Sequence, residues 1–263
     1  MFVRELKSNF KSALIWCLVL VGLFGVVMMA YPYIIDTDQM SMMSEMMDMF
    51  PKELLVAFNM DIAMIDTAFG WLKSEGLVMI LLILGCYSSM LGANILLKEE
   101  SDKTIEYLAS LPVSRTRIVV TKILVGLIYI VSVTLILGIV NFIALILAGS
   151  FDYLQFILLS ISPLLPSLCI YFISMFISTF THKTKHMIGV ALGITFVSYL
   201  FNVFSTISSS VEFLKYISVF TLADIRGIII NVSLNPVLLA ITLVVCGIFA
   251  ALTCVRYNKK ELV

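Results

Sequence analysis

The sequence predicts an all-α integral membrane protein with six transmembrane helices, an N-terminal interfacial helix and short helices in the outer loops. Of its 263 residues, 61% are hydrophobic and only 13% are charged, whereas soluble domains are about half apolar and about a quarter charged. The mean hydropathy is +1.08. Six apolar runs are long enough to cross a bilayer, at about 20 residues per helix. Residues 1–263 are therefore expected to form one transmembrane domain.

The six expected spans contain no Asp, Glu, Lys, Arg or His. They cover about residues 13–31, 77–97, 123–148, 155–180, 187–206 and 237–255. A cytoplasmic N-terminus would place thirteen of the 17 Lys and Arg residues on the inner side, which is the positive-inside pattern. We therefore expect a multi-pass protein of the cell membrane with both termini in the cytoplasm. Pro163 and Pro166 are expected to kink the fourth span.

Three further segments look amphipathic or apolar without being long enough to span. In residues 2–11, apolar and basic side chains occupy different helical faces, which predicts an interfacial helix. The stretch 41–50, SMMSEMMDMF, predicts a second helix lying on the outer leaflet. Its methionines could bind Cu(I), but no His or Cys lies nearby to complete such a site. Residues 219–230 are expected to dip into the membrane as a re-entrant segment.

Several function classes are disfavoured by what the sequence lacks. It has no G-x-x-x-x-G-K-[ST] phosphate loop, so it is not expected to bind ATP or any other cofactor itself. The expected spans carry no ionisable side chain that could relay protons or sodium ions. They also lack a serine elbow and an in-membrane histidine for proteolysis. His182 and His186 have a metal-compatible spacing, but Lys183 and Lys185 beside them oppose a cation. No catalytic or metal site is predicted.

The segment from Lys98 to Lys122 is the charged stretch between the second and third spans. Ser101 and Asp102 predict the start of one helix, and Pro112 predicts its end. Ser114 predicts the cap of a second helix that continues into the third span. Arg115 would then lie in a first helical turn, where the helix dipole disfavours a cation by ~0.3–1 kcal/mol.

Arg115 therefore needs a compensating partner. Three remain open: lipid phosphate, an acidic groove on another subunit, or a carboxylate of this segment, for which the candidates are Glu99, Glu100 and Glu106. A docking or gating surface is one interpretation of the segment, and ordinary positive-inside charge is the other.

The same segment resembles the permeases of type-2 ATP-binding-cassette (ABC) transporters. It reads Glu99-Glu100-Ser-Asp-Lys-Thr104-Ile-Glu106-Tyr-Leu108-Ala-Ser-Leu-Pro112-Val-Ser114-Arg115, and Lys122 follows it. The leading RELKSNFKSALIW, the loop runs FPKELLVAFNMD and GWLKSEG, and the basic tail RYNKKEL are also similar to that family. The family often has Gly before the Thr of the motif, where this chain has Lys103.

The resemblance implies a membrane-spanning subunit that is not itself an enzyme. It would form the pathway of an ATP-driven exporter with a second permease, identical or not, and would bind a separate ATPase subunit that holds the ATP. Membrane lipid is a further expected partner, and nucleic acid is not. The apolar spans favour an amphipathic or hydrophobic cargo such as a peptide or antibiotic. The residues expected to couple to the ATPase are Glu99, Glu100, Thr104, Glu106, Pro112, Ser114 and Arg115. The alternative function is a passive channel or a structural membrane scaffold without an ATPase partner.

Overall fold

The computed structural model confirms an all-helical membrane fold. It describes residues 2–34, 45–46, 49–50, 55, 67–105, 113–207 and 209–260, and these contain helices but no strand. Six helical segments within these ranges are long and apolar enough to cross a membrane. They are Phe2–Met29, Leu77–Ile95, Arg115–Ala148, Tyr153–Ser178, Thr184–Ile207 and Pro236–Lys259. The Met-rich stretch 41–50 lies largely outside the described residues.

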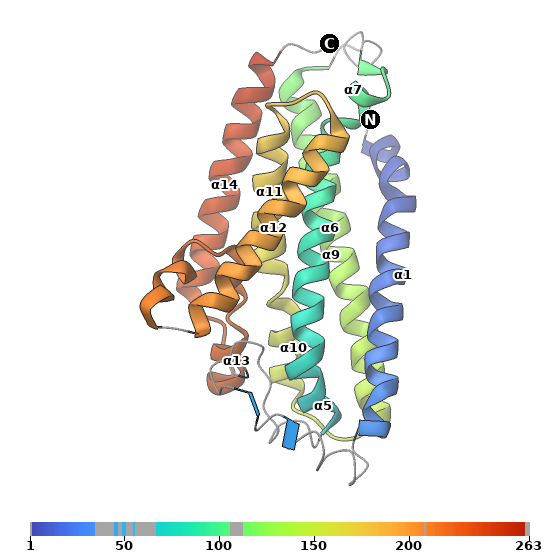
Figure 1. Cartoon of the computed structure of the whole chain (residues 1–263). Coiled ribbons are helices and arrows are strands. Elements are labelled where there is room, and N and C mark those ends of the chain that lie inside the picture. Colours follow the sequence, from blue (N-terminus) through green and yellow to red (C-terminus); the bar gives the residue numbers. More distant parts are fainter. Residues whose placement is uncertain are drawn as a thin grey trace.

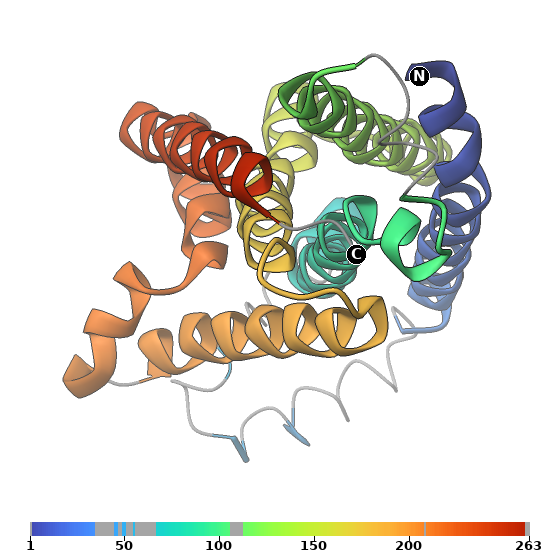
Figure 2. The same cartoon turned by 90° about the horizontal axis from the view of Figure 1, so that it is seen from above.

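Helix α6 (Leu77–Ile95) occupies the centre of the bundle. Helices α1 (Phe2–Ile34), α9 (Arg115–Ala148), α11 (Leu164–Ser178) and α12 (Thr184–Ile207) surround it, and α14 (Pro236–Lys259) packs outside α11 (Figures 1 and 2). Both chain termini lie at the same end of the bundle, which we call the termini end, and the opposite end is the far end (Figure 1).

Glycines allow α11 to pack closely on its neighbours. A Cβ on Gly92 of α6 would lie 2.4 Å from the Tyr171 carbonyl oxygen, and one on Gly126 of α9 would lie 2.2 Å from the Tyr171 hydroxyl. That hydroxyl is fully buried and donates a hydrogen bond to the Lys122 carbonyl oxygen at 3.1 Å. By contrast, a Cβ on Gly189 or Gly193 of α12 would meet nothing within 4 Å. Only some of the small residues in the spans therefore serve packing within this chain.

The N-terminal segment differs from the expected separate interfacial helix. Residues 2–11 form the first turns of α1 and continue into the span without a break. Glu5 and Asn9 are buried on one face, while Phe2 and Phe10 are exposed. The sequence has no Pro or Gly in this stretch that would end the helix, and packing of its polar face holds it against the bundle.

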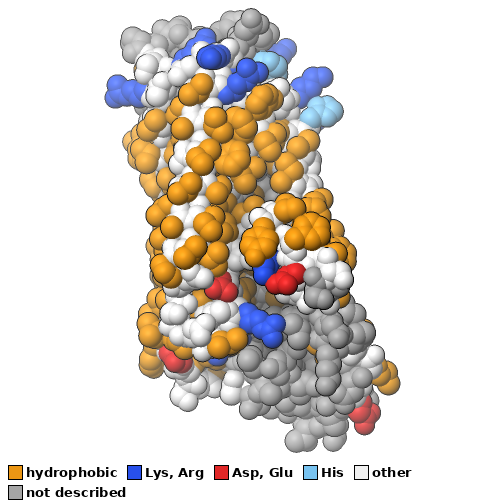
Figure 3. Space-filling model, turned by 90° about the vertical axis from the view of Figure 1, so that its left-hand side faces the viewer, with side chains coloured by type: hydrophobic (Ala, Val, Ile, Leu, Met, Phe, Trp, Pro, Cys, Tyr) orange, Lys and Arg blue, Asp and Glu red, His pale blue; other side chains and the backbone are white. Residues whose placement is uncertain are grey.

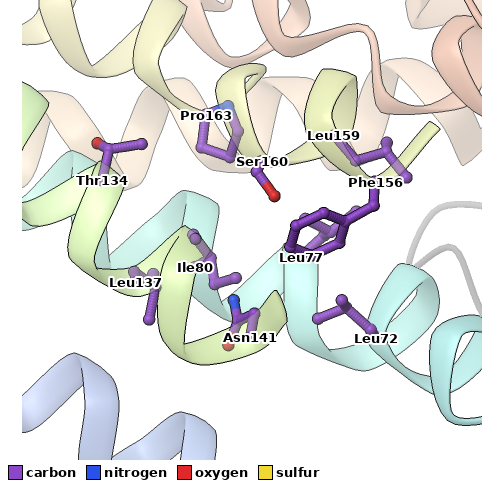
Figure 4. Close-up of a pocket in the computed structure, with 11 residues that line it drawn as sticks. Leu72, Leu77, Ile80, Thr134, Leu137, Asn141, Phe156, Leu159, Ser160 and Pro163 are labelled. Atoms are coloured by element: carbon purple, nitrogen blue, oxygen red, sulfur yellow. The ribbon is translucent and has the colours of Figure 1, made fainter. Parts of the chain in front are cut away.

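The fourth span breaks at Pro163, one of the two prolines expected to kink it, whereas Pro166 lies within the first turn of α11. The span divides into α10 (Tyr153–Ile161) and α11, because proline has no N–H to continue the helical hydrogen bonds. Beside the break lies a pocket of about 20 Å³ between α6, α9 and α10, with Ser160 and Thr134 in its wall (Figure 4). Asn141 also lines it, and its buried Oδ1 has no hydrogen-bond partner among the described residues.

Two segments complete the far end. Short helices α5 (Ala68–Trp71) and η1 (Leu72–Gly76) lead into α6. Between α12 and α14 the chain forms η2 (Ser209–Tyr216), η3 (Val219–Ala223) and α13 (Ile225–Asn231). The stretch expected to be re-entrant packs against the bundle: Phe220 is buried on Gly85 of α6, and the Ser218 hydroxyl donates to the Ser198 carbonyl of α12 at 2.7 Å.

Charge is segregated along the bundle. On the face shown in Figure 3, Lys, Arg and His gather at the termini end, charges of both signs appear towards the far end, and hydrophobic side chains cover the band between them. Such a band matches the hydrocarbon layer of a bilayer.

Candidate functional site

The charged segment Lys98–Lys122 meets both chain termini at one end of the bundle. It includes α7 (Lys98–Ser101) and the start of α9. The first turns of α1 lie beside it (Figures 1 and 2), and Lys260, directly after α14, contacts Glu100 of α7. The site is therefore assembled from segments that are far apart in the sequence.

A buried lysine joins three of these helices. Lys122 of α9 is 0% exposed, and its Nζ lies 2.8 Å from both carboxylate oxygens of Glu99. The same ammonium donates to the Ile95 carbonyl oxygen at 2.6 Å and lies 3.5 Å from a carboxylate oxygen of Glu5. Glu5 also accepts a hydrogen bond from Lys98 at 2.6 Å. Burial raises the pKa of the Glu99 carboxyl, and the adjacent Lys122 charge acts in the opposite direction. These four charged residues form the first ion-pair cluster.

A second ion-pair cluster joins Lys260, which directly follows α14, to Glu100, the residue next to Glu99. Lys260 Nζ lies 2.7 and 2.9 Å from the two oxygens of Glu100, and it donates to the Thr181 carbonyl oxygen at 2.7 Å. His182 Nδ1 lies 2.8 Å from Glu100 Oε2. Glu100 and Lys260 are 7% and 8% exposed. Successive glutamates in α7 thus bind opposite sides of the bundle, Glu99 towards α9 and α1, and Glu100 towards the chain end and the turn before α12.

Arg115 has a partner that none of the three expectations named. Its Nη1 donates to the carbonyl oxygens of Lys260 at 2.8 Å and Asn258 at 3.2 Å, at the C-terminus of α14. The last carbonyls of a helix lack intrahelical partners and carry its negative dipole charge. The cost of a cation at the start of α9 is therefore offset by a favourable contact with the end of α14. The Asn258 amide adds a hydrogen bond to Thr116 at 3.1 Å.

The local structure of the segment matches one expected helix start and contradicts the other. Ser114 caps α9, and its hydroxyl accepts from the Arg117 backbone N–H at 3.3 Å. Ser101 ends α7 rather than beginning a helix. Lys103 follows with φ of 54°, in the left-handed region, which costs a non-glycine residue about 1–2 kcal/mol. The Thr104 N–H then bonds the Glu99 carbonyl oxygen at 2.8 Å, closing the turn.

The expected coupling residues thus fall into three groups. Glu99 and Glu100 are buried in ion pairs and do not present their carboxylates to solvent. Thr104, Ser114 and Arg115 are exposed at the termini end. Glu106 and Pro112 lie outside the described residues.

The partners of Glu99 and Glu100 were not predicted from the sequence. Glu5, Lys98, Lys122, His182 and Lys260 complete the clusters. One usable signal was the position of Lys122, a lysine directly before a long apolar run and downstream of two adjacent carboxylates. Within the described ranges, no group of three His, Cys, Asp or Glu side chains is placed to hold a metal ion.

Comparison with known proteins places this architecture in a family. The family model described as ABC-2 family transporter protein matches residues 2–262. The chain belongs to the ABC-2 transporter family. It is therefore a membrane-spanning permease component of an ABC transporter. No curated protein and no solved structure matches this ABC-2 permease.

Proposed function

We propose that this chain is the permease half of an ATP-driven exporter, and that a separate ATPase subunit drives it from the termini end. Both termini would lie in the cytoplasm. Two permease subunits, identical or not, would form the pathway between them. The segment around Glu99–Arg115 would receive the movement of the ATPase when ATP binds, and the chain itself would hydrolyse nothing.

The two ion-pair clusters are the observation that carries this proposal. Through Glu5, Lys122 and Lys260 they fix the segment after α6 to α1, to α9 and to the chain end that follows α14. Separating a buried ion pair costs several kcal/mol, about 3–5 when one partner loses its counter-charge. A push on this segment would therefore move several spans together instead of bending one loop.

The division of roles among the motif residues follows from their burial. In this proposal, exposed Thr104, Ser114 and Arg115 would contact the partner. Buried Glu99 and Glu100 would transmit its movement. The contact residues and the transmitting residues can then be separated by mutation. A substitution at Thr104, Ser114 or Arg115 should weaken ATPase binding. A substitution at Glu99 or Glu100 should leave ATPase binding intact.

The cargo we propose is amphipathic or hydrophobic, such as a peptide or antibiotic. The expected spans lack ionisable residues along their middle, and the bundle face in Figure 3 shows a continuous hydrophobic band. Charged solutes would have no counter-charge there, and an unpaired charge in such surroundings is costly.

Co-purification with an ATPase subunit that carries the G-x-x-x-x-G-K-[ST] phosphate loop, followed by ATP hydrolysis in proteoliposomes, tests the proposal. The wild-type pair should form a complex and move an amphiphile from a panel of fluorescent compounds in an ATP-dependent way. Lys260→Met should keep the complex but lower ATP-dependent transport, because Glu100 loses its main cation. Lys185→Met, which removes an exposed lysine of α12, is the matched control and should behave as wild type. Full transport by Lys260→Met would refute the transmitting role of the Glu100–Lys260 pair. The absence of any complex with wild type would refute the proposed ATPase partner.

A further inference from the structure

We propose that a pocket at the far end binds a zwitterionic amphiphile, with its cationic group at Asp224 and its anionic group at Arg226. The pocket lies between the first turns of α6, the last turns of α12, and the η3–α13 segment that packs across them. Binding here does not depend on the ATPase-driven cycle proposed above. It can therefore be tested on the permease alone.

The size of the pocket fits part of an organic molecule rather than a water. Its volume is about 190 Å³, whereas one water needs only ~10–15 Å³ of such space. The wall is apolar on the bundle side, where Leu81, Val203 and Phe220 are buried. Five of the other lining residues have polar or charged side chains, namely Asn202, Thr206, Thr221, Asp224 and Arg226. An apolar wall with a few placed polar groups is typical of a small-molecule site.

The two charged residues of the pocket are not used to neutralise each other. Among the described residues, no ion pair joins Asp224 to Arg226 or either of them to another side chain. They stand two positions apart at the start of α13, a spacing at which helical side chains do not face each other. One acidic and one basic group are therefore available along the same pocket.

The backbone holds Asp224 in a fixed position. It adopts φ of 42°, and its Oδ1 accepts a hydrogen bond from the Gly227 N–H at 3.2 Å, which caps α13. Asp224 is half-buried as a residue, while Arg226 is exposed. A ligand with one charge would pair with one residue, and would leave the other to the solvent or bring a like charge towards it. A ligand carrying both charges satisfies the pair.

The position of the pocket suits an amphiphile whose apolar part comes from the lipid side. Phe196, Leu200 and Phe204 of α12 are large exposed hydrophobic or aromatic residues near the pocket-lining Tyr199 and Asn202. An acyl chain on this surface can continue onto the apolar wall of the pocket while the headgroup stays at the charged rim.

Isothermal titration of the purified protein in maltoside micelles tests the proposal. The probes are dihexanoyl phosphatidylethanolamine, which is zwitterionic, dihexanoyl phosphatidylglycerol, which is anionic, and decylammonium, which is cationic. Wild type should bind the zwitterion saturably and roughly tenfold more tightly than either singly charged probe, as expected for one added charge-assisted contact.

Matched variants assign the binding to the two charges. Asp224→Asn removes the charge but keeps the helix cap and tolerates the positive φ, and Arg226→Gln keeps the polar stem. Each should weaken binding of the zwitterion roughly tenfold. Lys215→Gln, on the neighbouring η2 and outside the pocket, should change nothing. Equal affinity for all three probes, unsaturable partitioning, or wild-type affinity in Arg226→Gln would each overturn the proposal.

Discussion

Replacing Lys122 with Met should destabilise the bundle strongly, and the cost can be worked out from its contacts. The ammonium is the centre of the first ion-pair cluster, with Ile95 O at 2.6 Å and both Glu99 oxygens at 2.8 Å. Without it, Glu5 keeps Lys98 at 2.6 Å, but the nearest remaining cation to Glu99 is Lys98 at 3.9 Å. The cost therefore falls mainly on the buried Glu99, and we expect a loss of ~3–5 kcal/mol in unfolding free energy.

A double variant tests whether the loss arises from the stranded carboxylate. Glu99→Gln combined with Lys122→Met removes both charges, so the combined loss should be smaller than that of Lys122→Met alone, about 1–3 kcal/mol. Lowering the pH should also reduce the loss in the single variant. Burial raises the pKa of Glu99 in the folded protein, so the carboxyl takes up a proton and loses its charge as the pH falls through that raised value.

The assay is equilibrium unfolding by SDS in mixed micelles, followed by far-ultraviolet circular dichroism. Lys185→Met is the control, since an exposed surface substitution usually changes stability by less than about 0.5 kcal/mol. The reasoning would be refuted if Lys122→Met lost less than about 1 kcal/mol, or if the double variant were less stable than the single one.

Three further predictions concern packing and local structure, each measured by the same unfolding assay. Gly92→Leu should lower the unfolding free energy by at least ~1–3 kcal/mol, because its side chain would meet the Tyr171 backbone. Gly189→Ala should leave the unfolding free energy unchanged, and equal losses in the two variants would contradict the close packing of α6 on α11. Lys103→Gly should raise the unfolding free energy by ~1 kcal/mol, because glycine adopts the positive φ without strain. A lower unfolding free energy would contradict a left-handed conformation at residue 103. Ser114→Ala should cost ~1 kcal/mol and Ser114→Asp should recover it, if the hydroxyl caps α9.

The helices could be predicted from the sequence because their signals are local. Apolar run length gives the spans, Pro163 marks the break in the fourth span, and Ser114 marks the start of α9. Ser101 was placed wrongly because a Ser-Asp pair suits a turn as well as a helix cap. Here it closes α7, and the left-handed Lys103 turns the chain away.

The ion-pair clusters could not be predicted because they depend on tertiary packing. Glu99 and Glu100 are adjacent in sequence, yet one pairs with Lys122 and the other with Lys260, 160 residues away. Likewise, the preference of Arg115 for the end of α14 is visible only once two helix termini are seen to meet. The charges of this segment suggested an exposed docking face, whereas Glu99 and Glu100 are buried in ion pairs within the protein.

We propose that this permease is driven at its termini end, through the two ion-pair clusters, by the ATP cycle of a partner subunit. The most direct measurement is uphill movement of a fluorescent amphiphile in proteoliposomes, with and without the candidate ATPase. Accumulation is expected only when permease, ATPase and ATP are all present, and it should be lost in Lys260→Met. Uphill accumulation by the permease alone would contradict this proposal.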